Sequence, residues 1–140
     1  MKAVFSCFIL FIFLFSCSLR LPKVVNSTRQ DWSVLQKNIS GTVFHLVLKS
    51  TTSNAELKID SLCISKEIIK DFKYSVLGKS NTTTDFTQGD SILISFNKEN
   101  KKNYLKYSKH KHDGVFIRLR NKNKFVKITA FKILPPIIND

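Results

Sequence analysis

The stretch that decides the fold is Thr-Val-Phe-His-Leu-Val-Leu-Lys, at residues 42–49. Its side chains alternate in character: Phe44, Leu46 and Leu48 share one face, and the other face carries Val43, His45, Val47 and Lys49. Successive side chains of a strand point to opposite sides, so a strict period of two indicates a strand with one buried face. Residues 42–49 therefore predict a strand of an antiparallel sheet.

The next segment, residues 57–64, has the same character with one irregularity. Its apolar residues keep one phase up to Ile59 and the opposite phase from Leu62 onward, which indicates a bulge or a move between sheets. The polar run Ser-Thr-Thr-Ser-Asn at 50–54 predicts a turn. We therefore expect the two segments to form an antiparallel hairpin with a short connection.

Further strands are expected along the rest of the chain. Alternating apolar residues predict strands over 92–96 and 115–119, and a last strand over 125–134 that ends at the prolines 135–136. Residues 65–77 fit either a helix face or a strand, and their Tyr, Val and Phe favour a strand in the second half. About seven short strands with turn residues between them indicate an all-β chain, a single immunoglobulin-like β-sandwich, with a small β-barrel as the alternative.

The charge of the chain is strongly unbalanced. Its 140 residues hold 23 Lys and Arg against 10 Asp and Glu, a formal net charge of +13. The segment from Lys98 to Lys132 is the most basic part, since its acids are Glu99 and Asp113. Such an excess draws a protein to anionic surfaces such as lipid headgroups, polyanionic glycans or nucleic acid. A composition rich in Lys and Asn, whose lysines only solvate loops, is the alternative explanation.

The N-terminus has the pattern of an export signal. Lys2 is followed by an apolar run over residues 3–15, which has the length of a signal-peptide core and is too short to span a bilayer as a stable helix. We therefore expect a signal peptide over 1–16, a lipid-anchored tether over 17–30 and the β-sandwich domain over 31–140.

The stretch Leu-Phe-Ser-Cys-Ser at residues 14–18 resembles a bacterial lipobox. That motif has an apolar residue three positions before its cysteine and a small residue directly before it. The resemblance implies cleavage before Cys17 and a diacylglyceryl group on the Cys17 sulfur. Lipid at this position would hold the protein to a membrane.

Ordinary secretion is the alternative to a lipid anchor. Ser16 and Ser18 also suit a conventional signal peptidase. Three Asn-X-Ser/Thr triplets begin at Asn26, Asn38 and Asn81, as in a glycosylated secreted protein. In this interpretation the chain is a soluble glycoprotein that acts in adhesion or host interaction.

Taken as a whole, the chain resembles small lipoproteins of Bacteroidota bacteria. The features that carry the resemblance are the junction at 14–18, the strand Ile-Asp-Ser-Leu at 59–62 and the pattern Phe-x-x-Gly-Asp-x-Ile at 86–92. The resemblance implies an exported protein of the outer membrane or periplasm, and it implies no particular chemistry.

Aromatic residues lie within the basic tract, and together they give the best binding hypothesis. If Arg118 and Arg120 share an outer strand face with Phe116, they form a cationic patch with a ring beside it. Such a patch suits an anionic glycan or a lipid headgroup, whereas an exported location disfavours nucleic acid. The expected patch consists of Lys101, Lys102, Tyr104, Lys106, Tyr107, Lys109, Lys111, Phe116, Arg118 and Arg120.

Catalytic and metal motifs are weak. His110 and His112 would share a face on a strand, as metal ligands do, but His45 is the only other histidine and lysines flank the pair. Cys63 has no evident partner base and fits a strand core better than a nucleophile. We therefore expect a non-catalytic protein without a cofactor that binds or scaffolds at the cell envelope, where an envelope protein is a further partner. A small metal-binding or enzymatic domain is the alternative.

Overall fold

The computed structural model describes residues 20–80, 83–99 and 109–139. Their regular structure consists of one 3-10 turn, η1 (Leu35–Lys37), and nine strands. The strands are β1 (Lys23–Val34), β2 (Ile39–Lys49), β3 (Leu57–Ile64), β4 (Glu67–Ile69), β5 (Lys73–Val76), β6 (Ser91–Glu99), β7 (Gly114–Leu119), β8 (Lys122–Lys127) and β9 (Lys132–Asn139). Within these ranges, no helix has the length and apolar character needed to cross a membrane.

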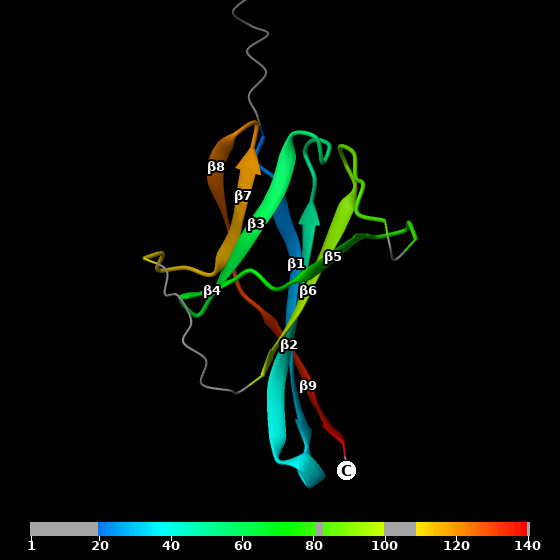
Figure 1. Cartoon of the computed structure of the whole chain (residues 1–140), viewed down its shortest axis with the longest axis vertical. Helices are drawn as coiled ribbons and strands as arrows, with labels where there is room; N and C mark the ends of the chain where they lie inside the picture. Colours follow the sequence, from blue (N-terminus) through cyan, green and yellow to red (C-terminus); the bar gives the residue numbers. More distant parts are fainter. Residues whose placement is uncertain (1–19, 81–82, 100–108, 140) are drawn as a thin grey trace, which may run out of the picture.

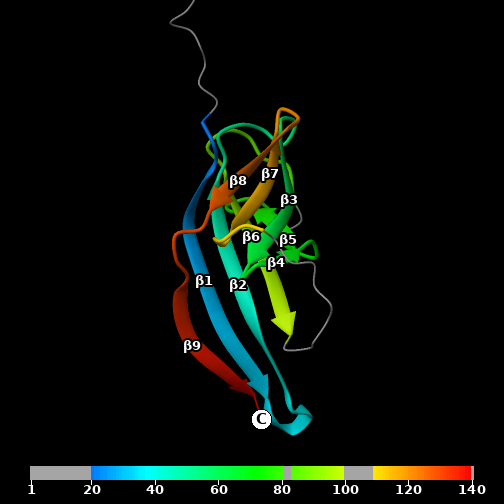
Figure 2. The same cartoon turned by 90° about the vertical axis from the view of Figure 1, so that its left-hand side faces the viewer.

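The strands form two sheets that pack face to face (Figure 1). The first sheet has the order β5-β6-β2-β1-β9 and the second has the order β4-β3-β7-β8. Apart from β9, these neighbours match strands D, E, B and A of an immunoglobulin domain in one sheet and C′, C, F and G in the other. Figure 2 shows the sheets as separate layers. The expected sandwich is confirmed, and the alternative of a small barrel is wrong for the described residues.

The hydrophobic core lies between the two sheets and follows the expected alternation. Phe44, Leu46 and Leu48 on β2 are buried, as residues 42–49 predicted. Each sheet thus buries one face and leaves the opposite face to solvent. The rest of the core consists of Leu57, Leu62, Ile64, Val76, Phe86, Ile92, Ile94, Phe96, Val115, Ile117, Leu119, Val126 and Ile128.

β2 and β3 are consecutive in the chain but do not pair. β2 pairs with β1 and β6, whereas β3 pairs with β4 and β7 in the other sheet. The expected hairpin of residues 42–49 and 57–64 is therefore wrong, because alternation shows which face of a strand is buried and not which strand lies beside it. The expected bulge is confirmed, since the register of β3 against β7 shifts between Ile59 and Ser61.

The segment expected as a tether, residues 17–30, lies partly in the first sheet. β1 begins at Lys23 and pairs with β2 along its whole length. Before it, Pro22 is buried, and the Thr51 hydroxyl donates a hydrogen bond of 2.7 Å to the carbonyl oxygen of Arg20. This segment is ordered by its pairing with β2, the next strand in the chain, and not by a local apolar pattern. The domain therefore starts earlier than expected.

Residues 65–77 contribute two short strands. β4 follows β3 through the two-residue turn Ser65-Lys66, in which φ is 52° and 67°. Two positive φ angles are the mark of a type I′ turn, whose twist matches that of a hairpin. The second half of the segment forms β5, as its β-favouring residues predicted, but β5 lies on β6 in the other sheet.

The end of the chain differs from the single strand expected over 125–134. β8 ends at Lys127, and β9 begins at Lys132 in the other sheet, parallel to β1. Pro135 and Pro136 lie inside β9 and do not end it. The register against β1 shifts at this point, and β9 is an edge strand, so the missing N–H groups are tolerated.

The molecule has two distinct ends. β1, β2 and β9 run beyond the second sheet as an arm, with η1 at its tip (Figure 1). The start of β1, the start of β3 and the β7–β8 turn lie at the opposite end, and both views agree on this placement. The described chain thus begins at the end that lies farthest from the arm tip.

Candidate anionic-ligand site

The outer face of the second sheet carries the described part of the expected patch. The alternate apolar residues of β7 point into the core, so Phe116 and Arg118 point outward. Arg120 follows in the β7–β8 turn, where its φ is 45°. Strand alternation thus accounts for the outward positions of Phe116 and Arg118, whereas Arg120 lies beyond the strand and owes its position to the turn.

Both arginines are already paired with a carboxylate. Arg118 Nη2 lies 3.5 Å from Asp60 Oδ2, and Arg120 Nε lies 3.0 Å from Glu56 Oε2. All four side chains are partly exposed, so these pairs contribute little to stability. They do offset the charge of the arginines. The net positive charge of this face therefore comes from lysines.

Glu56 holds the β7–β8 turn against the loop before β3. The pKa of Glu56 is lowered mainly by a hydrogen bond from the Thr52 hydroxyl, 2.7 Å long, and next by the Arg120 guanidinium. The Arg120 backbone N–H also donates to the Glu56 carbonyl oxygen at 2.8 Å. Glu56 is thus ionised at neutral pH, and a neutral side chain in its place would release Arg120 as a free cation.

Arg118 and Arg120 line a single surface hollow of about 280 Å³. Lys58 lies directly opposite Arg118 on β3 and lines the same hollow. Lys58 was not among the expected patch residues, because an isolated basic residue on a strand carries no local signal of its cross-strand neighbour. We refer to this site as the cationic hollow, which is lined by Ala55, Glu56, Lys58, Arg118, Arg120 and Asn121.

Exposed lysines extend the positive charge along β8, the edge strand of the second sheet. Lys122, Lys124 and Lys127 are exposed, and none of them forms an ion pair with a described residue. Lys127 lies on the outer side of the sheet, whereas Lys122 and Lys124 lie opposite Leu119 and Ile117 and are exposed at the open edge of its inner side. Lys109 and Lys111 are exposed in the segment before β7. The other members of the expected patch lie outside the described residues; these are Lys101, Lys102, Tyr104, Lys106 and Tyr107. The expected signal peptide and Cys17 also lie outside them.

Phe116 belongs to an aromatic cluster and does not stand open beside the arginines. Its ring centroid lies 4.9 Å from Phe125 and 5.0 Å from His110, and His110 stacks on Phe125 at 4.3 Å. Gly114 makes room for this packing, since a Cβ there would lie 2.4 Å from Phe125 Cζ. The cluster covers the outer face of β7, so Phe116 serves packing more than ligand contact.

The histidines do not assemble a metal centre in the described chain. His110 packs on Phe125, His112 is exposed, and His45 lies on β2 in the other sheet. Across residues 20–80, 83–99 and 109–139, no three His, Cys, Asp or Glu side chains gather where they could hold a metal ion. Cys63 is a free, fully buried thiol on β3.

The candidate site is thus a cationic hollow joined to a lysine-rich strand. The residues that line the hollow come from the start of β3, the end of β7 and the turns beside them, which lie at the end of the molecule where β1 starts (Figure 1). Thr51 bonds to Arg20, and its neighbour Thr52 bonds to Glu56, so a short loop links the chain's described start to the hollow. Comparisons of this chain with protein-family models, with curated proteins and with solved structures found no match.

Proposed function

We propose that this chain is an exported, non-catalytic binding module, held at the cell envelope by lipid on Cys17, whose basic end lies against anionic lipid headgroups. The observation that carries the proposal is that the chain segments that line the cationic hollow lie at the end of the molecule where β1 starts (Figure 1). β1 begins six residues after Cys17, at Lys23, and an extended chain of that length spans about 20 Å. Lipid on Cys17 would therefore keep this end close to a membrane.

Lipid and basic residues reinforce each other at such a surface. A single acyl chain binds only marginally, and each Lys or Arg close to an anionic bilayer adds about 1 kcal/mol. Lys58 and the β8 lysines supply the charge, and the two arginines add donors that suit phosphate oxygens. A headgroup is favoured over a free glycan because the anchor would already hold the bilayer beside the hollow.

The same orientation leaves the arm pointing away from the membrane. Exposed apolar side chains lie at its tip, where Leu35 is 62% and Ile138 is 63% exposed. An envelope protein is the partner that a scaffold of this shape would meet on its outer side.

The test uses the purified protein and vesicles of phosphatidylcholine with or without phosphatidylglycerol. The triple variant Lys58→Gln/Lys122→Gln/Lys124→Gln removes three cations, so we expect about hundredfold weaker binding to the anionic vesicles. Glu56→Gln frees Arg120 and is expected to strengthen binding. The matched control, with the same loss of charge on other surfaces, is Lys37→Gln/Lys70→Gln/Lys73→Gln.

The control separates a specific face from simple net charge. Equal weakening by both triple variants, or binding that does not fall steeply as salt rises, would contradict the proposal. Dextran sulfate forms the second arm of the experiment: tighter binding to this polyanion than to the anionic vesicles would point to a glycan instead of a headgroup.

A further inference from the structure

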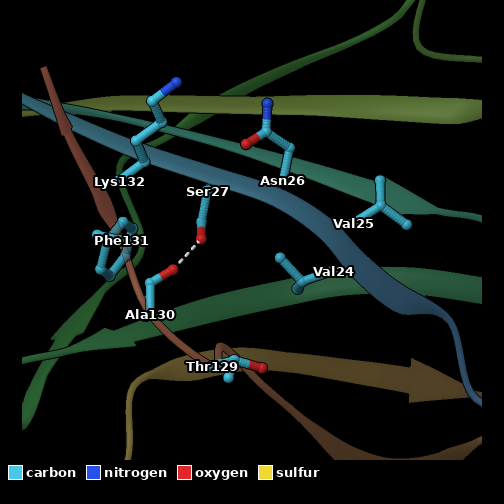
Figure 3. Close-up of a pocket in the computed structure, with 8 residues that line it drawn as sticks. All are labelled: Val24, Val25, Asn26, Ser27, Thr129, Ala130, Phe131 and Lys132. Atoms are coloured by element: carbon cyan, nitrogen blue, oxygen red, sulfur yellow. Dashed lines mark hydrogen bonds between the residues drawn. The ribbon is translucent and has the colours of Figure 1, made fainter.

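The start of β1 has a strand on only one of its edges. Its pairing with β9 begins at Thr28, opposite Lys132, so residues 23–27 have β2 on one side and no described strand on the other. Figure 3 shows the reason: the chain at 129–132 diverges from β1 and leaves a wedge-shaped opening. We refer to this opening as the wedge; its volume is about 430 Å³, and its walls are residues 24–27 and 129–132.

The walls of the wedge offer unpaired backbone. Along a free strand edge, alternate residues direct N–H and C=O groups outward, where they are available to another chain. The opposite wall, 129–131, belongs to no strand. The Ser27 hydroxyl donates to the carbonyl oxygen of Ala130 and fastens the two walls at this point (Figure 3). An opening between two stretches of irregularly paired backbone is a place where an extended segment can add to a sheet.

Side chains around the wedge suit an alternating segment. Val24 and Phe131 are half-buried and supply apolar surface, while Val25 is 55% exposed at a bulge where the register against β2 shifts. An extended chain presents alternate side chains to opposite sides, so apolar residues at every second position can meet this surface.

The rim of the wedge is positive. Lys132 lines it, Lys23 directly precedes it and lies opposite Lys49 on β2, and no Asp or Glu is among the lining residues. A second copy of this chain, with its net charge of +13, would bring a similar surface and be repelled. An acidic segment would be attracted and steered to the site.

We propose that the wedge accepts an extended acidic segment of a partner protein, which pairs with the free edge of β1 as an added strand. This goes beyond membrane docking, because the wedge lies on the first sheet and the cationic hollow on the second. The two sites share no lining residue, so a substitution in one can be tested without altering the lining of the other.

The test measures binding of a fluorescent eight-residue peptide in which Glu and Val alternate. Ala130→Trp fills the wedge and is expected to weaken binding by about tenfold or more. Ala55→Trp places the same bulk in the cationic hollow and is the matched control, expected to leave peptide affinity unchanged. Thr129→Trp replaces Ala130→Trp if thermal unfolding shows that the first variant is not folded.

Two further readouts show whether the peptide adds as a strand. Bound peptide is expected to slow hydrogen exchange at the amides of 23–27, and N-methylation of its alternate residues is expected to abolish binding. Equal binding of the N-methylated peptide would overturn the proposal. The proposal would also be overturned if Ala55→Trp, and not Ala130→Trp, weakened peptide binding. That result would place the peptide in the cationic hollow, and it would not contradict the proposed membrane function. If the protein self-associated and this slowed hydrogen exchange at the same amides, the occupant of the wedge would be a second copy of the chain and the proposal of an acidic partner would be wrong.

Discussion

The carboxylate of Asp90 fixes the turn that leads into β6. Its Oδ2 accepts hydrogen bonds from Lys79 Nζ and from the Thr87 backbone N–H, both at 2.8 Å. The pKa of Asp90 is lowered, first by Lys79 and then by the Thr87 N–H. A carboxyl group whose pKa is lower in the folded state stabilises the protein above its unfolded pKa, and this contribution is lost as the pH falls through the folded pKa.

Asp90→Asn is therefore expected to be less stable than the wild type at neutral pH, with a difference that shrinks as the pH falls from about 5 to about 3. Urea unfolding at a series of pH values measures this. Lys79→Gln, which removes the larger cause of the shift, is expected to reproduce much of the pH-dependent loss. A difference between wild type and Asp90→Asn that stays constant over this range would contradict the assignment.

Single residues also show how far sequence can define the candidate site. Alternation along β7 was enough to place Phe116 and Arg118 on one outer face. The carboxylates that pair with the arginines were not predictable, because Glu56 and Asp60 reach them only through the pairing of β3 with β7. A charge count over a segment treats every cation as free, whereas the fold offsets some of them with acids from distant positions.

The backbone conformation of a turn affects the stability of the short strands that it joins. In the β3–β4 turn, Lys66 has a φ of 67° and is exposed. This left-handed conformation costs a residue with a Cβ about 1–2 kcal/mol and costs glycine little, although glycine loses more entropy on folding. Lys66→Gly is therefore expected to stabilise the protein by about 0.5 kcal/mol, measured as a higher urea midpoint.

The matching control places glycine in an ordinary extended position. Lys73→Gly on β5 is also exposed, and it is expected to destabilise the protein by about 0.5–1 kcal/mol. If Lys66→Gly lowered the midpoint as much as Lys73→Gly does, the positive φ at Lys66 would not be the feature that limits this turn.

At the scale of elements, the faces of strands were predictable and their partners were not. Residues 42–49 and 115–119 bury the faces that their alternation indicated. The expected hairpin failed because the loop after β2 crosses to the other sheet, and both strands still reach the same core. Residues 23–30 were expected as a tether because their order depends on pairing with β2 and β9, which no local pattern records.

At the scale of the whole molecule, the start of β1 lies opposite the tip of the arm, so the proposed anchor would join the domain at its basic end (Figure 1). The intact mass of the protein from its native membrane fraction tests the anchor directly. We expect a chain that begins at Cys17 and carries acyl groups, with a mass above that of the polypeptide alone. Mild hydrolysis of the ester-linked acyl chains is expected to lower this mass.

A different measured mass would favour one of the alternatives to the lipid anchor. A chain that begins near Leu19 and carries no lipid would contradict the anchor and remove the reason for favouring a headgroup over a glycan. Added hexose mass would favour the secreted glycoprotein, and Asn26 and Asn38 are both exposed and accessible to such a modification.

The parallel pairing of β9 with β1 has a consequence for the order in which the chain can fold. The bond between Ser27 and Ala130 joins positions 103 apart, so β1 gains β9 as a neighbour only after residues 132–139 are available. Contacts of such long separation form late, because the entropy of closing the loop must be overcome first. In a nascent chain emerging from the ribosome, the first sheet would thus stay incomplete until residues 132–139 have appeared. Such a delay would be compatible with the proposed export, in which the chain passes through a translocation channel before it folds.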